Sequence, residues 1–239
     1  MSLKLVLGLA GIAMGLRQIS GGVRHLKEAS GTSRRPSRGP SRPASRKKVR
    51  PVGVSSLDDV FVPTPSGSIR LRTYLIKDLD GRIDYLRELV QAGKRDPAVF
   101  EFARRAVNAR CGDNWCVPEK NNFAEAKALF DAVRANVRYT SDIAGIDTYQ
   151  KPSHTLALHT GDCDDYSTLA CAAAATLGLP CRFKVIRTKG APTWNHIYAQ
   201  IGLPRARPRK WISFDASVAM PFGWEPPKSM IAEARVFNL

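Results

Sequence analysis

The chain has 239 residues, of which 44% are apolar, 24% charged and 8% aromatic. This composition is ordinary for a globular protein, and it excludes a wholly disordered chain, a collagen and a multi-span membrane protein. The net charge of +16 is concentrated, because residues 1–50 hold twelve basic residues against one acid, Glu28. Length and charge together predict one domain of moderate size behind a basic N-terminal tail.

Residues 1–29 contain an apolar run at 3–16, and apolar side chains continue at helical spacing as far as Leu26. This pattern predicts an N-terminal helix of up to about 25 residues. The run is shorter than the roughly 18 apolar residues of a membrane span, and Lys4 alone is a weak start for a signal peptide. Four interpretations stay open: a membrane-associating helix, a helix that docks on a partner, a signal peptide and a hydrophobic anchor.

Residues 30–51 are rich in Ser, Arg and Pro, and no large apolar residue occurs before Val49. Such a segment cannot build a core, so a linker is predicted. Its basic residues between 34 and 50 would attract phosphate, either in nucleic acid or on an anionic membrane surface. A solubilising spacer is an equal alternative, because no aromatic residue is interleaved for stacking on bases.

The folded domain is expected over residues 52–239. Alternating apolar residues predict a strand at 68–75, and helical spacing predicts helices at 82–92, 97–109 and 122–137. Asp162 can cap a helix that runs from Cys163 to Leu177 and stops at Gly178 and Pro180. Strands follow at 181–188, 195–201 and 210–214, with coil after Ala216. The predicted fold class is α+β.

Five cysteines leave at least one thiol free in a monomer. Cys111 and Cys116 suit a local disulfide or two packed thiols, and no second ligand pair with zinc-site spacing accompanies them. Cys171 and Cys181 are expected to be core thiols, with a reducing compartment as the simpler interpretation. No metal or cofactor is predicted.

Cys163 begins the predicted helix, where free N–H groups and the helix dipole favour an anion and lower the pKa of a thiol. His196 lies in the second following strand and Asp215 ends the third, so adjacent antiparallel strands can bring the imidazole to the thiol and the carboxylate to the imidazole. The histidine would deprotonate the thiol and later protonate the leaving amine, while the carboxylate orients the ring. His159, close before Cys163, is expected to be structural or exposed.

Three sequence blocks carry these residues: GDCDDY at 161–166, NHIYAQ at 195–200 and WISFDA at 211–216. In this order they resemble the transglutaminase-like cysteine peptidase superfamily, and NVRY at 136–139 with QKP at 150–152 looks like the lead-in of bacterial and bacteriophage members. The resemblance covers about residues 122–217. It implies a papain-like core, in which a nucleophile helix packs on an antiparallel sheet, with Cys163 as nucleophile, His196 as base and Asp215 as acid.

Asp164 and Asp165 follow the nucleophile directly, and their charge opposes a low thiol pKa unless they point away. The Cys163 backbone N–H is the expected oxyanion donor, and Gln150 or Asn195 could supply a second donor. The substrate-binding residues are predicted to be Trp194, Asn195 and Trp211, although core packing explains the two tryptophans equally well.

The predicted function is a thiol-dependent hydrolase or acyltransferase acting on peptide or carboxamide bonds. Release of the acyl group to water gives a peptidase or amidase, and release to a lysine amine gives a transglutaminase. The resemblance suggests a phage virion-associated protein, with residues 1–28 docked on virion subunits and with a protein or peptide as substrate. One alternative is a catalytically silent structural virion component, and another is a membrane-anchored cell-wall peptidase. The expected location is the virion or the bacterial cytoplasm, with membrane association as the alternative.

Overall fold

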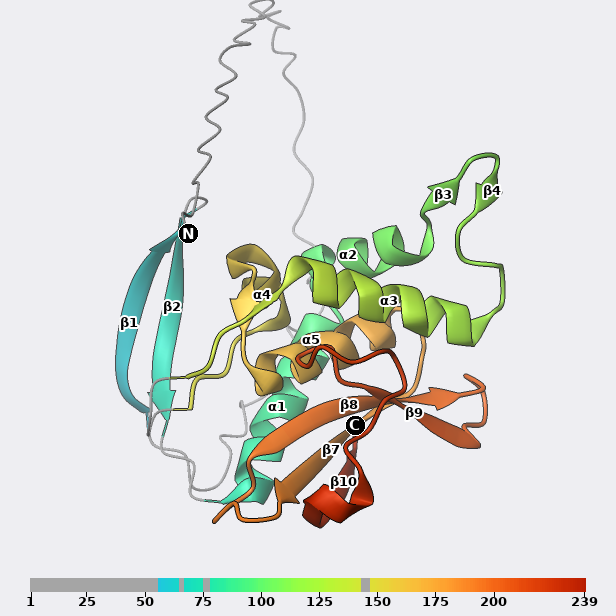
Figure 1. Ribbon diagram of the computed structural model, residues 1–239. Coiled ribbons are helices and arrows are strands. Elements are labelled where there is room, and N and C mark those ends of the chain that lie inside the picture. Colours follow the sequence, from blue (N-terminus) through green and yellow to red (C-terminus); the bar gives the residue numbers. More distant parts are fainter. Residues whose placement is uncertain (1–55, 65–66, 75–77, 143–146) are drawn as a thin grey trace, which may run out of the picture. The chain divides into compact units, whose positions relative to one another are not determined.

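A computed structural model describes residues 56–64, 67–74, 78–142 and 147–239 (Figure 1). The predicted N-terminal helix at 1–29 and the basic linker at 30–51 lie outside the described residues. The first described element is a two-stranded antiparallel hairpin of β1 (Ser56–Thr64) and β2 (Gly67–Tyr74). The strand predicted at 68–75 is confirmed as β2. Its partner β1 was not predicted, because Asp58, Asp59 and Pro63 are residue types that strands disfavour.

A four-stranded antiparallel sheet, in the order β10-β7-β8-β9, forms one layer of the domain. The three predicted strands are confirmed as β7 (Cys181–Thr188), β8 (His196–Leu203) and β9 (Lys210–Phe214). The prediction of coil after Ala216 is wrong for β10 (Ile231–Asn238), which pairs with β7. The strand was missed because it lies at an edge of the sheet with most side chains exposed, so its sequence lacks a buried apolar face.

Helices form the second layer. The four predicted helices are confirmed as α1 (Leu79–Gly93), α2 (Pro97–Val107), α3 (Asn122–Asn136) and α5 (Cys163–Thr176). The short α4 (Pro152–Leu158) was not predicted. Each of the four longer helices has an Asp or Asn N-cap whose side chain accepts a hydrogen bond from a backbone N–H of the first turn, which explains where these helices begin.

Shorter elements connect these layers. They are β3 (Arg110–Cys111), β4 (Asn114–Trp115), β5 (Arg138–Tyr139), β6 (Thr160–Gly161) and a 3₁₀ turn at Lys228–Met230. The β5 and β6 strands pair in parallel, Arg138 with Thr160 and Tyr139 with Gly161. This pairing brings the end of α3 beside the start of α5.

Helix α5 is the centre of the core. It packs on β8 and is contacted by α1, α2, α3 and α4 (Figure 1). All eight residues from Ser167 to Ala174 are buried, and four of them are alanines, which allow neighbouring helices to approach closely. A side chain at Gly93 of α1 would place its Cβ 2.5 Å from Pro152 Cγ and 2.9 Å from Ala172 Cβ. Packing on all sides therefore fixes α5, whose first residue is Cys163.

Two disulfides pair four of the five cysteines. Cys111–Cys116 closes the β3–β4 hairpin, in agreement with one of the two predictions for that pair. Cys171–Cys181 joins α5 to β7, so the prediction of two separate core thiols is wrong. The turn after α5 brings the chain back with a Cα–Cα distance of 5.4 Å, which is within the range of a disulfide. Cys163 is the free thiol, and the argument for a reducing compartment no longer holds.

Within the described ranges, none of the helices has the length and apolar character that crossing a membrane requires.

Candidate active site

The N-terminus of α5 fixes the position of Cys163. Asp162 is the N-cap, and its Oδ1 accepts hydrogen bonds from the N–H of Asp164 at 3.0 Å and of Asp165 at 3.4 Å. The Asp165 carboxylate in turn accepts from the Asp162 N–H at 3.3 Å, which completes a capping box. The helix therefore starts at Cys163, as predicted, and this half-buried residue lines a pocket.

His196 and Asp215 lie at matching ends of neighbouring strands. His196 is the first residue of β8, Asp215 directly follows β9, and His196 Nε2 is 2.7 Å from Asp215 Oδ2. Asp215 is only 5% exposed, and its other oxygen, Oδ1, accepts a hydrogen bond from Ser217 Oγ at 2.6 Å. Since Nε2 donates to the carboxylate, Nδ1 is the ring nitrogen left to accept a proton.

Hydrogen bonds join the helix that carries the thiol to the strand that carries the imidazole. The Ser167 hydroxyl lies 2.7 Å from the carbonyl oxygen of Cys163 and 3.2 Å from that of Ile197, the residue after His196. Cys163 and His196 are thus held on elements that cannot move apart without breaking these bonds.

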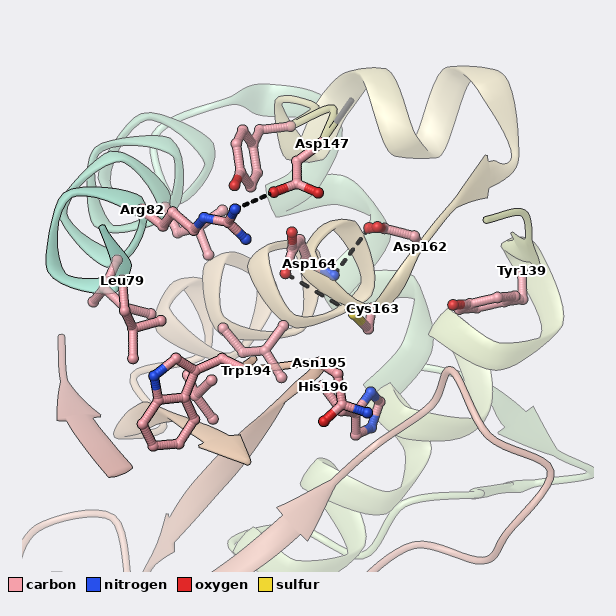
Figure 2. Close-up of a pocket in the computed structure, with 15 residues that line it drawn as sticks. Leu79, Arg82, Tyr139, Asp147, Asp162, Cys163, Asp164, Trp194, Asn195 and His196 are labelled. Carbon is pink, nitrogen blue, oxygen red and sulfur yellow. Dashed lines mark hydrogen bonds and ion pairs between the residues drawn. The ribbon is translucent and has the colours of Figure 1, made fainter. Parts of the chain in front are cut away.

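Cys163 and His196 line one pocket of about 210 Å³ (Figure 2). Trp194 and Asn195 line the same pocket, as do Tyr139 and residues of α1 and of the segment before α4. Of the latter, Arg82 and Asp147 form an ion pair at 2.6 Å. Sequence reasoning missed Arg82 and Asp147, because each is an ordinary polar residue in its own segment and only the fold brings the two together.

Trp211 lies elsewhere. It lines a second pocket, and the guanidinium of Arg182 lies over its ring at 4.1 Å from the centroid. Trp211 precedes Asp215 by four residues along β9 and the turn after it, a span of about 13 Å in an extended chain. It is therefore not brought together with Cys163, unlike Trp194 and Asn195.

The two candidates for a second oxyanion donor are engaged in other hydrogen bonds. Gln150 Nε2 donates to Asp165 Oδ2 at 2.9 Å and to the Thr160 carbonyl oxygen at 3.3 Å. Asn195 Nδ2 donates to Thr188 Oγ1 at 3.0 Å. Both amides therefore hold the scaffold of the site in this structure.

His159 has a structural position, as expected. It ends α4 in a left-handed conformation, with φ of 56°, and its Nδ1 lies 2.9 Å from the Asn136 carbonyl oxygen. This contact ties the end of α4 to the end of α3.

The two acids after Cys163 point in different directions. The Asp165 carboxylate turns away from the thiol and accepts hydrogen bonds from the backbone N–H of Gln150 at 2.8 Å and from Gln150 Nε2. Burial raises the pKa of Asp165 to about 7. The Asp164 carboxylate instead faces the thiol, with Cys163 Sγ 3.9 Å from Oδ1.

The electrostatic environment opposes ionisation of the thiol. Burial raises the pKa of Cys163 well above its ordinary value, and the carboxylates of Asp164 and Asp162 raise it further. The N–H of Ile197 acts in the opposite direction but does not compensate. The lowered thiol pKa expected from the helix start is therefore not found, because desolvation and the adjacent acids outweigh the helix N-terminus.

No group of three or more His, Cys, Asp or Glu side chains is placed to hold a metal ion in the part of the chain that the structure describes.

One comparison with known proteins matches the part of the chain that contains these residues. A family model described as the transglutaminase-like superfamily matches residues 109–216, which include Cys163, His196 and Asp215. This match is to the family that the three sequence blocks resemble, and the mixed arrangement of helices and sheet confirms the α+β fold class. Comparison with curated proteins gives no match.

Three solved structures resemble the chain at low identity. A proposed cysteine protease from Cytophaga hutchinsonii is 17% identical with a TM-score of 0.41, and the match covers 80% of this chain and 77% of that one. A proposed protease from Parabacteroides distasonis ATCC 8503 is 12% identical with a TM-score of 0.44, covering 76% and 31%. A structure described as a TGase is 17% identical with a TM-score of 0.34, covering 74% and 48%. The matches span less than half of the second and third proteins.

Proposed function

We propose that the protein is a thiol-dependent hydrolase or acyltransferase that acts on peptide or carboxamide bonds. Cys163 is the nucleophile, His196 the general base and then the general acid, and Asp215 the acid that orients the imidazole. One observation carries the proposal. The free thiol of Cys163, at the start of α5, shares one pocket with His196, and Nε2 of this histidine is hydrogen-bonded to the buried carboxylate of Asp215.

In the first half of the reaction His196 Nδ1 takes the thiol proton while the sulfur attacks the carbonyl carbon. The backbone N–H of Cys163, in the first turn of α5, can donate to the oxyanion that forms. The protonated imidazole then gives its proton to the leaving amine, and a thioester remains on Cys163. In the second half His196 takes a proton from the water or amine that attacks the thioester, and the imidazolium returns this proton to the sulfur of Cys163 as the bond between the acyl carbon and the sulfur breaks.

The raised thiol pKa defines the role of the histidine. Since burial and the neighbouring acids keep Cys163 protonated at rest, proton transfer to His196 has to accompany the attack. Asp215 stabilises the imidazolium that results, and Ser217 holds the second oxygen of that carboxylate. The site therefore depends on the complete chain of contacts from Ser217 to His196.

Turnover of a panel of peptide amides tests the proposal. The assay measures ammonia release in the presence and absence of a primary amine, and mass spectrometry distinguishes hydrolysed from amine-coupled product. We expect turnover by the wild type and none by Cys163→Ala, with the product distribution deciding between hydrolase and acyltransferase. Equal turnover by the two proteins would refute the proposal.

We further propose that the protein acts as part of a phage particle. The support is the sequence alone: the apolar segment at 1–28, the basic segment at 34–50 and the resemblance of the lead-in blocks to bacteriophage members. Deletion of residues 1–28 should abolish co-purification with particles while leaving Cys163 reactive. Loss of membrane association instead would favour the membrane-anchored peptidase, and incorporation with no turnover by the full chain would favour the silent virion component.

A further inference from the structure

We propose that the pocket beside Cys163 takes a substrate whose acyl part carries a primary ammonium group, as in a lysine-type or other diamino side chain, and that Asp164 is the counter-charge for it. This inference rests on the proposed function and names the substrate class of the same site. The ammonium group is bound and stays unreacted, so it is distinct from any amine that attacks the thioester.

Asp164 differs from the two acids beside it in having few hydrogen bonds. Asp162 accepts from two backbone N–H groups of the first turn, and Asp165 accepts from the backbone and side chain of Gln150. Among the described residues, the one hydrogen bond to the Asp164 carboxylate comes from the Cys163 thiol, at 3.9 Å. Figure 2 shows the carboxylate between Arg82 and Cys163, on the wall of the pocket.

The nearest cation does not neutralise Asp164. Arg82 lies in the same pocket, but its guanidinium is paired with Asp147 at 2.6 Å. Arg82 favours the charged form of Asp164, but burial and the carboxylates of Asp162, Asp165 and Asp147 raise the pKa of this acid well above its ordinary value. Asp164 therefore lacks a counter-charge strong enough to hold its carboxylate ionised. A primary ammonium would stabilise the ionised form, since it carries a full positive charge and three N–H donors.

The wall of the pocket suits the aliphatic part of such a side chain. Trp194 and Leu79 line it on the side away from Tyr139 (Figure 2). A lysine-type stem packs on apolar and aromatic surface while its ammonium group stays at the charged end. A carboxylate or phosphate in the same place would meet Asp164 without a free cation, so anionic substrates are disfavoured.

Binding of the cation has a consequence for the nucleophile. In its ionised form Asp164 raises the pKa of the Cys163 thiol. An ammonium group paired with the carboxylate cancels that field, so Asp164 can bind the substrate without opposing attack by the thiol. The acid next to the nucleophile can thereby select the substrate.

A pair of small thiol reagents tests the charge preference without knowledge of the substrate. Aminoethyl and sulfonatoethyl methanethiosulfonate each form a disulfide with a thiolate and release methanesulfinate, and they differ mainly in charge. Cys163 is the one unpaired cysteine, so intact mass reports reaction at a single site. The rates are measured at mildly alkaline pH, and N-acetylcysteine is the reference thiol.

We expect the ratio of the cationic to the anionic rate at Cys163 to exceed the reference ratio by about tenfold or more. Asp164→Asn should bring the ratio close to the reference, and Asp164→Glu should keep the preference. The matched control is Asp80→Asn, which removes an exposed acid paired with Arg235 and should leave the ratio as in the wild type. The net charge of +16 would by itself favour the anionic reagent, so a cationic preference reports the pocket.

Equal ratios in the wild type and Asp164→Asn would overturn the inference, as would a wild-type ratio no higher than the reference. If Asp164→Asn does not fold, the wild type alone decides: added salt must lower the ratio toward the reference, and a ratio independent of salt overturns the inference. These outcomes are separate from failure of the proposed function, in which turnover of peptide amides would survive Cys163→Ala.

Discussion

Replacing Asp215 by Asn tests the role of the buried carboxylate. The change is nearly isosteric, but it removes the negative charge 2.7 Å from His196 Nε2. The Asp215 side chain is 3% exposed and that of His196 19%, so water screens the pair weakly. Two unit charges about 4 Å apart attract by about 4 kcal/mol at an effective dielectric constant of about 20. Loss of this attraction to the imidazolium predicts an acylation rate about 10³-fold lower.

The assay is acylation of Cys163 by a p-nitrophenyl ester, and the rate is measured from the absorbance of the nitrophenolate that this step releases. Thermal unfolding of Asp215→Asn checks that the variant is folded. Asp80→Asn removes an equal charge from an exposed side chain that pairs with Arg235 and is not among the residues lining the pocket, and it should stay within about twofold of the wild type, as is usual for surface substitutions. A loss smaller than about tenfold in folded Asp215→Asn would refute the view that this carboxylate stabilises a charged imidazole.

Three further predictions follow from individual contacts. Ser217→Ala removes the donor to Asp215 Oδ1 and should lower the same acylation rate by about tenfold. Ser217→Thr keeps a hydroxyl and should restore the rate. The matched control Ser213→Ala removes a buried hydroxyl without a hydrogen-bond partner and should leave the rate unchanged. The pKa of Asp165 is raised to about 7 from 3.8, so the folded protein holds this proton more tightly than the unfolded chain does. The free energy of unfolding should therefore fall by up to about 4 kcal/mol as the pH rises from about 4 to above 7. Urea titrations of the wild type at several pH values should show this decrease, and Asp165→Asn should lack it. Removal of residues 1–50 should leave one cooperative thermal transition, since the Ser/Arg/Pro segment has no apolar surface to bury, and loss of that transition would contradict the expected domain organisation.

The helix and strands around the site could be predicted because their signals are local. Helix α5 is located in the sequence by its cap, Asp162, and by its stop, Gly178 and Pro180. The three β-rich runs that follow locate β7, β8 and β9. The pairing of β8 with β9 then brings Asp215 to His196. Local patterns therefore placed the thiol, the imidazole and the carboxylate on the correct elements.

The directions of adjacent polar side chains could not be predicted. Asp164 and Asp165 are consecutive and chemically identical, and only the capping box and the distant Gln150 turn Asp165 away and leave Asp164 beside the thiol. The Cys171–Cys181 bond likewise depends on how the chain returns after α5. Both features follow from tertiary contacts, which a linear pattern does not record.

The central claim, that Cys163 forms a covalent acyl intermediate with the help of His196, is tested most directly by trapping. The wild-type protein is mixed with a p-nitrophenyl ester, quenched in acid after less than one turnover, and analysed by intact mass and peptide mapping. We predict one added acyl group on the peptide that contains Cys163, no adduct in Cys163→Ala, and strongly slowed formation in His196→Ala. An acyl group on another residue, or equal labelling of Cys163→Ala, would contradict the account.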